Sequence, residues 1–336
     1  MSQPYIALGS LLAMAVTVVF VGAHRLRKLL PHNERLGVLD LSDAFAIPLN
    51  GSVTLLSMYV LLRLLPKEYF IALISLGINI LATISLKTFM SLYLKSSILA
   101  GTLSVIIGTL SFLCGNWIAS NILAFVMGIS AIETIVFDNF FNSFVLLICL
   151  FFYDIFWVFG SDAMITVASG IDGPIKLVFP NDIFGDHSTK SLLGLGDLVV
   201  PGIFISQTLI FSRDFVKRGN FYFNVAIISY TISLANTMAV MIYFHHGQPA
   251  LLFIVPWLLI TFCITAWYRG DLMVAFKFNI EKVCSEQIEK NDISGCTSEE
   301  NLWDFSPTKI LQYLKLSLGE EFKSGKDNKK VKSKGN

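Results

Sequence analysis

The stretch LLGLGDLVVPGIFI, residues 192–205, places a single charged residue, Asp197, in an otherwise uncharged and mostly apolar run. Apolar runs of about 20 residues recur along the chain, and each is long enough to cross a hydrocarbon core about 30 Å thick. Charged residues make up 15% of the 336 residues, whereas soluble domains are about 25% charged. We therefore predict a polytopic membrane protein.

The apolar runs predict nine spans, and we expect helices because lipid offers no partner to an unpaired backbone group. The expected spans lie near residues 5–23, 45–65, 69–89, 97–114, 117–136, 143–167, 191–211, 222–244 and 248–268. Nearly half of the charged residues follow residue 268, which indicates a soluble tail. The prediction is an all-α membrane protein with an N-terminal four-helix part (1–114), a second transmembrane part (115–268) and a tail (269–336).

Basic residues orient the chain, because loops on the cytosolic side are enriched in Lys and Arg. Nine of them fall on the side of the C-terminus, namely Arg25, Arg27, Lys28, Arg35, Lys87, Lys95, Arg213, Lys217 and Arg218. Four fall on the other side, namely Arg63, Lys67, Lys176 and Lys190. Since nine spans put the termini on opposite sides, we predict a lumenal N-terminus and a cytosolic C-terminus.

The last five residues, KSKGN, suggest a location. Lys332 and Lys334 fit a K-x-K-x-x signal for retrieval to the endoplasmic reticulum, although two lysines near a basic end also arise by chance. A cytosolic tail is what such a signal requires, and the charge distribution predicts that placement independently.

A second aspartate, Asp154, lies in the sixth expected span, and Asp197 lies in the seventh. The two helices are antiparallel neighbours in this layout. If the sixth span ends near Asp162, then at 1.5 Å per residue Asp154 lies about 12 Å and Asp197 about 9 Å from the lumenal ends of their spans. We therefore expect the two carboxylates to meet inside the bilayer.

Two carboxylates at one apolar site do not both ionise cheaply, so the pair tends to share one proton. An aspartic protease uses that state, because the ionised member takes a proton from water while the protonated member hydrogen-bonds the scissile carbonyl. The residues alone leave two other classes open. The acids could form the proton or cation relay of a transporter, which Glu133 in the fifth span would favour unless it is hydrogen-bonded near a span end. The chain could also be a scaffold that binds membrane helices without cutting them.

Glycines surround the second aspartate. Gly194 and Gly196 have no Cβ, so another backbone can approach Asp197, as an extended substrate would in β-strand addition. Close packing of helices through small residues explains the glycines equally well. In QPAL (248–251), Pro249 could open an unwound edge that pairs with substrate, or it could simply occupy the first turn of a helix.

Four segments carry a family resemblance: FFYDIFWVFG (151–160), PIKLVFP (174–180), LLGLGDLVVPGIF (192–204) and QPALL (248–252). With its YD, GLGD and PAL motifs in this order, the chain resembles the signal peptide peptidases, which are presenilin-type intramembrane aspartyl proteases. The resemblance implies that Asp154 and Asp197 are the catalytic pair. It also implies a set of residues that shape the substrate cleft or support it: Tyr153, Gly194, Leu195, Gly196, Gln248, Pro249, Ala250 and Leu251.

The same resemblance implies the substrates and the setting. Signal-peptide remnants and type II membrane helices would be cleaved within the endoplasmic reticulum membrane, with no metal, cofactor or nucleic acid. Further expectations are a homo-oligomer, quality-control partners in the endoplasmic reticulum and no need for accessory subunits.

Overall fold

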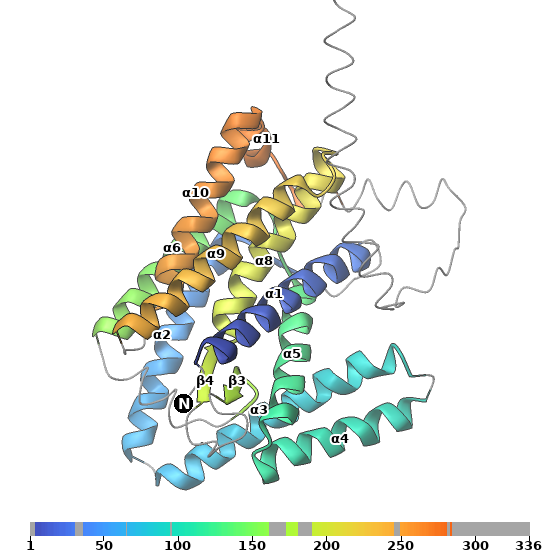
Figure 1. The fold of residues 1–336 in the computed structure, drawn as a ribbon, viewed down its shortest axis with the longest axis vertical. Helices are drawn as coiled ribbons and strands as arrows, with labels where there is room; N and C mark the ends of the chain where they lie inside the picture. The colour runs from blue at the N-terminus through green and yellow to red at the C-terminus, as the bar shows by residue number, and fades with distance from the viewer. Residues whose placement is uncertain are drawn as a thin grey trace, which may run out of the picture.

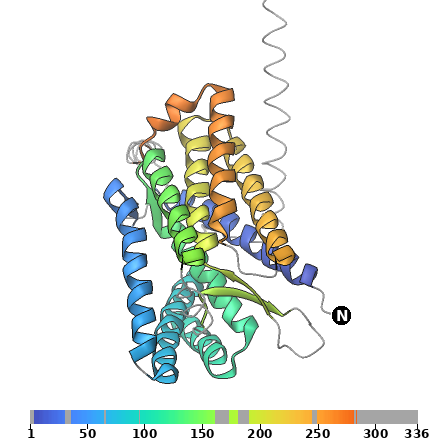
Figure 2. The ribbon, with the colours of Figure 1, turned by 90° about the vertical axis from the view of Figure 1, so that its left-hand side faces the viewer.

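The computed structural model describes residues 4–30, 36–64, 66–94, 96–160, 173–180, 190–244, 249–280 and 283. The described chain is mostly helical (Figures 1 and 2). Its helices are α1 (Pro4–Leu29), α2 (Leu41–Leu64), α3 (Lys67–Ser91), α4 (Ser97–Cys114), α5 (Trp117–Thr134), α6 (Phe140–Gly160), α8 (Gly196–Ile210), α9 (Phe221–Phe244), α10 (Leu251–Arg269) and α11 (Leu272–Phe276). A π-helix, η1 (Phe211–Phe215), continues α8.

Nine of the described helical segments are long and apolar enough to cross a membrane, which confirms the predicted number of spans. The seventh of these, Gly196–Phe215, lies at the centre, since 72% of its apolar window is buried in the protein against 6% for α2. In Figure 1, α1 crosses in front of α8, while α6, α9 and α10 gather on one side of it and α3, α4 and α5 on the other. Figure 2 shows α2 standing on the outside of the bundle beside α6.

Local sequence explains where the helices begin and end. Between α4 and α5, Gly115 adopts a left-handed conformation (φ 57°) that ends one helix, and the Asn116 side chain accepts the Ile118 N–H at 2.9 Å to begin the next. Gly270 ends α10 in the same way (φ 73°). Such caps supply partners to the backbone groups that a helix end leaves unpaired.

Four short strands form two small sheets in the described part of the chain. Strands β1 (Gly37–Leu39) and β2 (Ile135–Phe137) pair in parallel. Strands β3 (Lys176–Pro180) and β4 (Lys190–Gly194) pair antiparallel, with Val178 opposite Leu192. The second pair lies between α6 and α8 in the sequence and leads directly into the start of α8 (Figure 2).

A cluster of phenylalanines binds the far end of α8 to its neighbours. The Phe140 ring stacks on Phe262 of α10, with centroids 4.6 Å apart, and meets Phe211 edge to face at 5.2 Å. Phe278, which follows α11 and is 1% exposed, packs on Phe140 and Phe211. The first described residues of the expected tail are thus part of the helical core.

The boundaries of two expected spans need correction. Residues 191–194 belong to β4, so the helix predicted over 191–211 begins only at Gly196. The first helix extends past the predicted end at residue 23 to Leu29, which brings basic residues into a regular helix. Residues 161–167 of the expected sixth span lie outside the described residues.

Candidate active site

Asp154 is held by the start of another helix. It lies on α6, six residues before Gly160, and is 4% exposed. Its Oδ2 accepts a hydrogen bond of 3.0 Å from the backbone N–H of Leu251, the first residue of α10. That N–H is one of the amides that a helix N-terminus leaves unpaired, and the positive end of the helix dipole points at the carboxyl group. The PAL motif therefore positions Asp154.

Asp197 is the second residue of α8 and is half-buried. The carboxyl groups of Asp197 and Asp154 lie close enough to repel each other electrostatically. The buried Tyr230 hydroxyl of α9 lies 3.5 Å from the Asp197 carbonyl oxygen. The structure thus brings together the two aspartates that are 43 positions apart in the sequence, with Asp197 in a helical first turn rather than well inside a span.

The β3–β4 hairpin carries the glycines that precede Asp197. A Cβ on Gly194, the last residue of β4, would lie 3.4 Å from Asp197 Oδ2, whereas a Cβ on Gly196 would meet no atom within 4 Å. Leu195 between them is 8% exposed, and its N–H bonds the Ile175 carbonyl at 2.9 Å. The GLGD motif therefore runs from a strand into a helix and leaves open space beside the aspartate at Gly196.

Tyr153, adjacent to Asp154, faces α2. A Cβ on Gly51 of α2 would lie 3.5 Å from the Tyr153 ring and from its hydroxyl. One turn further along α6, the Trp157 indole N–H donates to Ser52 Oγ at 3.2 Å. The sequence contained a signal for this contact, since Gly51 and Ser52 are small residues in an apolar span, but nothing in it named the partner helix.

The described part of QPAL starts a helix. The carbonyls of Pro249 and Ala250 accept hydrogen bonds from Leu252 and Ile254, at 3.3 Å and 3.2 Å, within the first turn of α10. Both residues are buried, as is Leu251. Gln248 lies outside the described residues.

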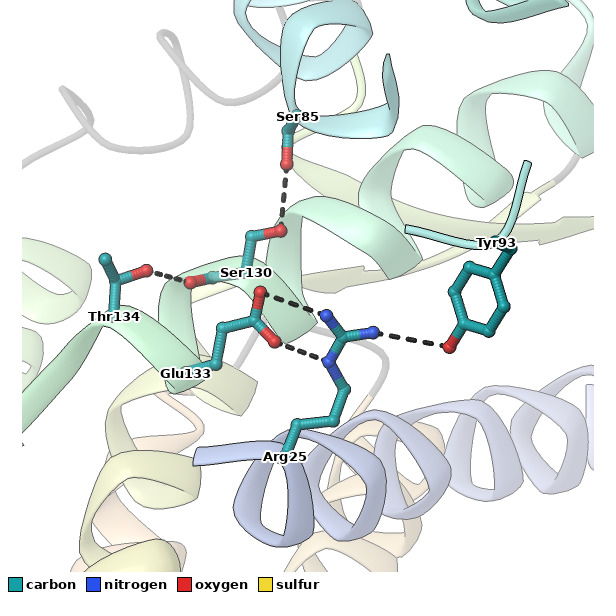
Figure 3. Close-up of polar contacts among 6 residues, drawn as sticks. All are labelled: Arg25, Ser85, Tyr93, Ser130, Glu133 and Thr134. Carbon is teal, nitrogen blue, oxygen red and sulfur yellow. Dashed lines mark hydrogen bonds and ion pairs between the residues drawn. The ribbon is translucent and has the colours of Figure 1, made fainter. Parts of the chain in front are cut away.

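Glu133, the third acidic residue expected inside the membrane, has a basic partner (Figure 3). Arg25 of α1 reaches its carboxylate with Nε at 2.5 Å and Nη2 at 3.4 Å. The same guanidinium lies 3.5 Å from the Tyr93 hydroxyl and 4.5 Å over the Phe89 ring. Glu133 is the penultimate residue of α5, so its hydrogen-bonded carboxylate lies near the end of a span. This is the position in which the sequence predicts that Glu133 would not favour a relay. Glu133 does not extend the aspartate pair into a chain of acids.

These features define a class: a multi-pass membrane protein whose helices bring two acidic side chains together, as in an intramembrane protease. The family model described as signal peptide peptidase matches residues 32–282. The chain belongs to the signal peptide peptidase family.

Three relatives extend this assignment. The chain is 38% identical over 258 residues to a probable intramembrane protease of Schizosaccharomyces pombe, covering 74% of this chain and 84% of that protein. It is 30% identical over 347 residues to the signal peptide peptidase of Homo sapiens and 29% over 348 residues to that of Mus musculus, covering 91% of this chain and 90% of each of them.

Proposed function

We propose that the protein is an aspartic endopeptidase that cleaves signal-peptide remnants and type II membrane helices within the endoplasmic reticulum membrane. The observation that carries the proposal is the neighbouring pair of aspartates: Asp197 lies in the first turn of α8, and Asp154 accepts the N–H of the first residue of α10. Family membership supports protease chemistry, and the two carboxyl groups supply a means for it without a metal or a nucleophilic side chain.

The reaction follows from one proton shared by the pair. The ionised carboxylate takes a proton from a water molecule, whose oxygen attacks the scissile carbonyl carbon. The protonated carboxyl group hydrogen-bonds the carbonyl oxygen and transfers its proton to it, which gives a tetrahedral diol. The first carboxyl group then gives the proton it took from water to the amide nitrogen, while the second carboxylate takes a proton from a diol hydroxyl. The C–N bond breaks, a new carboxyl end and a new amino end are released, and the pair returns to its starting state.

A substrate helix must first become extended, because a helix hides its carbonyls in its own hydrogen bonds. Within the described part of the chain, the sheet of β3 and β4 has two strands, so the other edge of β4 is without a neighbouring strand. An extended substrate added to this edge would lead past Gly194 and Gly196 to Asp197. Tyr153 and the start of α10 would then lie beside the pair from the side of Asp154.

The setting is part of the proposal. Nine spans with basic residues concentrated on one side support a cytosolic C-terminus and a lumenal N-terminus. The lysines at 332 and 334, which lie outside the described residues, would then face the cytosol as a retrieval signal requires. Assembly into a homo-oligomer and contact with quality-control partners in the endoplasmic reticulum remain predictions.

The test uses purified protein in lipid with a synthetic signal-peptide helix and detects products by mass spectrometry. Asp154→Asn and Asp197→Asn should each reduce cleavage by about 10²–10⁴-fold or more, since each removes a group that moves protons. Asp40→Asn, which changes an exposed acid that precedes α2, is the matched control and should cleave normally. Cleavage that survives in either of the first two variants would show that the catalytic assignment is wrong.

A further inference from the structure

Asn121 of α5 binds the backbone of the hairpin in the manner of a neighbouring strand. Its Nδ2 donates to the Val178 carbonyl at 2.6 Å, and its Oδ1 accepts the Val178 N–H at 2.8 Å. The asparagine is 8% exposed, so this interaction is shielded from competing polar groups. One side-chain amide thereby satisfies both backbone groups of a residue 57 positions away, on the edge of β3.

The pairing register shows which way these groups point. In an antiparallel pair, residues alternate between those whose backbone groups bond the opposite strand and those whose groups point outward. The Val178 groups bond Asn121 and so point away from β4, and the bond from the Leu195 N–H to the Ile175 carbonyl fits the same alternation. Leu192, opposite Val178, must therefore point its own N–H and C=O toward the outer edge of β4.

The two edges of the hairpin are consequently different. Asn121 occupies the outer edge of β3 at Val178, the middle residue of that strand. The outer edge of β4 has no strand beside it in the described structure, and Leu192 is 48% exposed. Gly194 also points its backbone groups outward by the same alternation, and it lies next to Asp197 Oδ2.

We propose that Asn121 is a positioning residue for cleavage, an inference that rests on the proposed protease function. By occupying the edge of β3 it leaves β4 as the edge on which an extended substrate can add. By tying the hairpin to α5 it also fixes the hairpin against the helical bundle. Since β4 passes into α8 within one residue, this fixes which substrate peptide bond lies against the aspartate pair.

The consequence of losing Asn121 is specific. The hairpin would still be joined to α8 at Leu195 but could tilt about that point, and Val178 would present unpaired backbone groups that compete for substrate. Slippage of a strand by one residue turns every side chain to the other face, so slippage by two is favoured. New products should therefore differ from the normal ones by two residues.

The experiment compares peptide products of the wild type with those of Asn121→Leu, which keeps the size of the side chain and removes both hydrogen bonds. We expect a share of cleavage to move by two residues and KM to rise about tenfold. Asn121→Gln, which retains the amide, should restore much of the normal bond choice. The matched control is Asn79→Leu, the same change at a residue that is 7% exposed in α3 and packed near Gly108 of α4, and it should keep the normal products.

The outcomes separate the two proposals. If the wild type cleaves and Asn121→Leu cuts the same bonds in the same proportions with an unchanged KM, Asn121 is a structural residue only and the inference is overturned. If Asn121→Leu does not accumulate, Asn121→Ser, whose hydroxyl can serve only one Val178 group at a time, replaces it with the same expected direction. Absence of cleavage by the folded wild type would instead overturn the protease function itself.

Discussion

The ion pair between Arg25 and Glu133 provides a quantitative test of the packing of α1 against α5 (Figure 3). The Arg25 side chain is 2% exposed and that of Glu133 is 17% exposed, so neither charge is well hydrated. Replacing Arg25 by Met keeps an unbranched apolar side chain and removes the guanidinium. The carboxylate of Glu133 is then left in the protein interior without its ionic partner.

Two estimates of the cost agree. Breaking a buried ion pair by removing one partner destabilises proteins by about 3–5 kcal/mol. If Glu133 instead takes up a proton in the folded variant, the cost at pH 7 is about 3.7 kcal/mol, from an ordinary glutamate pKa of about 4.3. Loss of the cation–π contact with Phe89 adds up to about 1 kcal/mol. We expect Arg25→Met to lose about 4 kcal/mol of unfolding free energy.

The assay is a double-mutant cycle of unfolding in detergent with Arg25→Met, Glu133→Gln and the double variant. The double variant contains neither charge and should lose only about 1–2 kcal/mol. Since Arg25→Met alone should lose about 4 kcal/mol, the coupling energy should exceed about 2 kcal/mol. If the folded variant carries a proton on Glu133, the stability loss of Arg25→Met should also shrink by about 1.4 kcal/mol per pH unit as the pH falls toward 4.3. The reason is that binding this proton costs less free energy at lower pH, until the unfolded chain binds it as well.

Additive losses in the cycle, with the double variant as unstable as the sum of the single ones, would refute this reasoning. They would mean that each side chain is stabilised by other groups and that the pair carries no coupling. The cleavage rate per folded molecule serves as a control, and it should be unchanged. Glu133 lies near the opposite end of α5 from Asn121, about 18 Å along the helix.

Three further substitutions, the last with a matched control, test the packing and the site. Gly22→Ala would place a Cβ 3.0 Å from the Ile132 Cβ, so thermal unfolding should show a loss of about 1–3 kcal/mol. Gly196→Ala meets no atom within 4 Å and should keep the wild-type melting temperature, yet cleavage should fall about tenfold if substrate occupies that space; unaltered kinetics would contradict substrate passage there. Phe278→Ala should cost about 3–5 kcal/mol of unfolding free energy because the ring is 1% exposed. Met273→Ala, at a side chain that is 76% exposed, should change stability by less than about 0.5 kcal/mol. A loss for Phe278→Ala as small as that for Met273→Ala would show that the segment after α10 does not support the core.

The number of spans could be predicted because each helix must bury an apolar length of its own in lipid. This requirement acts on every span separately, so it is visible in local composition. Pairing of Asp154 with Asp197 could be anticipated for a related reason. Acidic residues in apolar spans need a partner or a function, and these two lie on consecutive spans without a lysine or arginine.

The hairpin was missed because its signal is ambiguous. The residues KSLLG of β4 continue without a break into the apolar start of α8, and a short apolar run fits a strand as well as a helix. What decides for a strand is the partner β3 and, beyond it, the amide of Asn121. Asn121 lies in a different span, far from β4 in the sequence, and one sequence alone offers no way to match an asparagine in one span to the backbone edge of a strand that follows another span.

The partner of Glu133 was missed for a different reason. Ending the first span at residue 23 left Arg25 among the loop residues, where a basic side chain is assumed to be hydrated. In the structure α1 continues to Leu29, and one more helical turn carries Arg25 into contact with α5. Composition shows where a span can begin and end, but tertiary contacts decide how far the helix continues.

The placement of the two aspartates suggests how the membrane interior tolerates them on spans that contain no lysine or arginine. Asp197 lies in the first turn of α8, and Asp154 accepts the first N–H of α10. A helix N-terminus carries about half a positive charge, and an acid there is stabilised by up to about 2 kcal/mol in partly buried sites. That is enough to hold the side chains in place and too little to hold both permanently ionised, as an ion pair with arginine would. The proposed mechanism needs this intermediate strength, because in it the pair would bind, release and regain one proton in each cycle. The hairpin that ends at Gly194 and the proline at 249 therefore serve the same purpose, because each determines where a helix begins beside the aspartate pair.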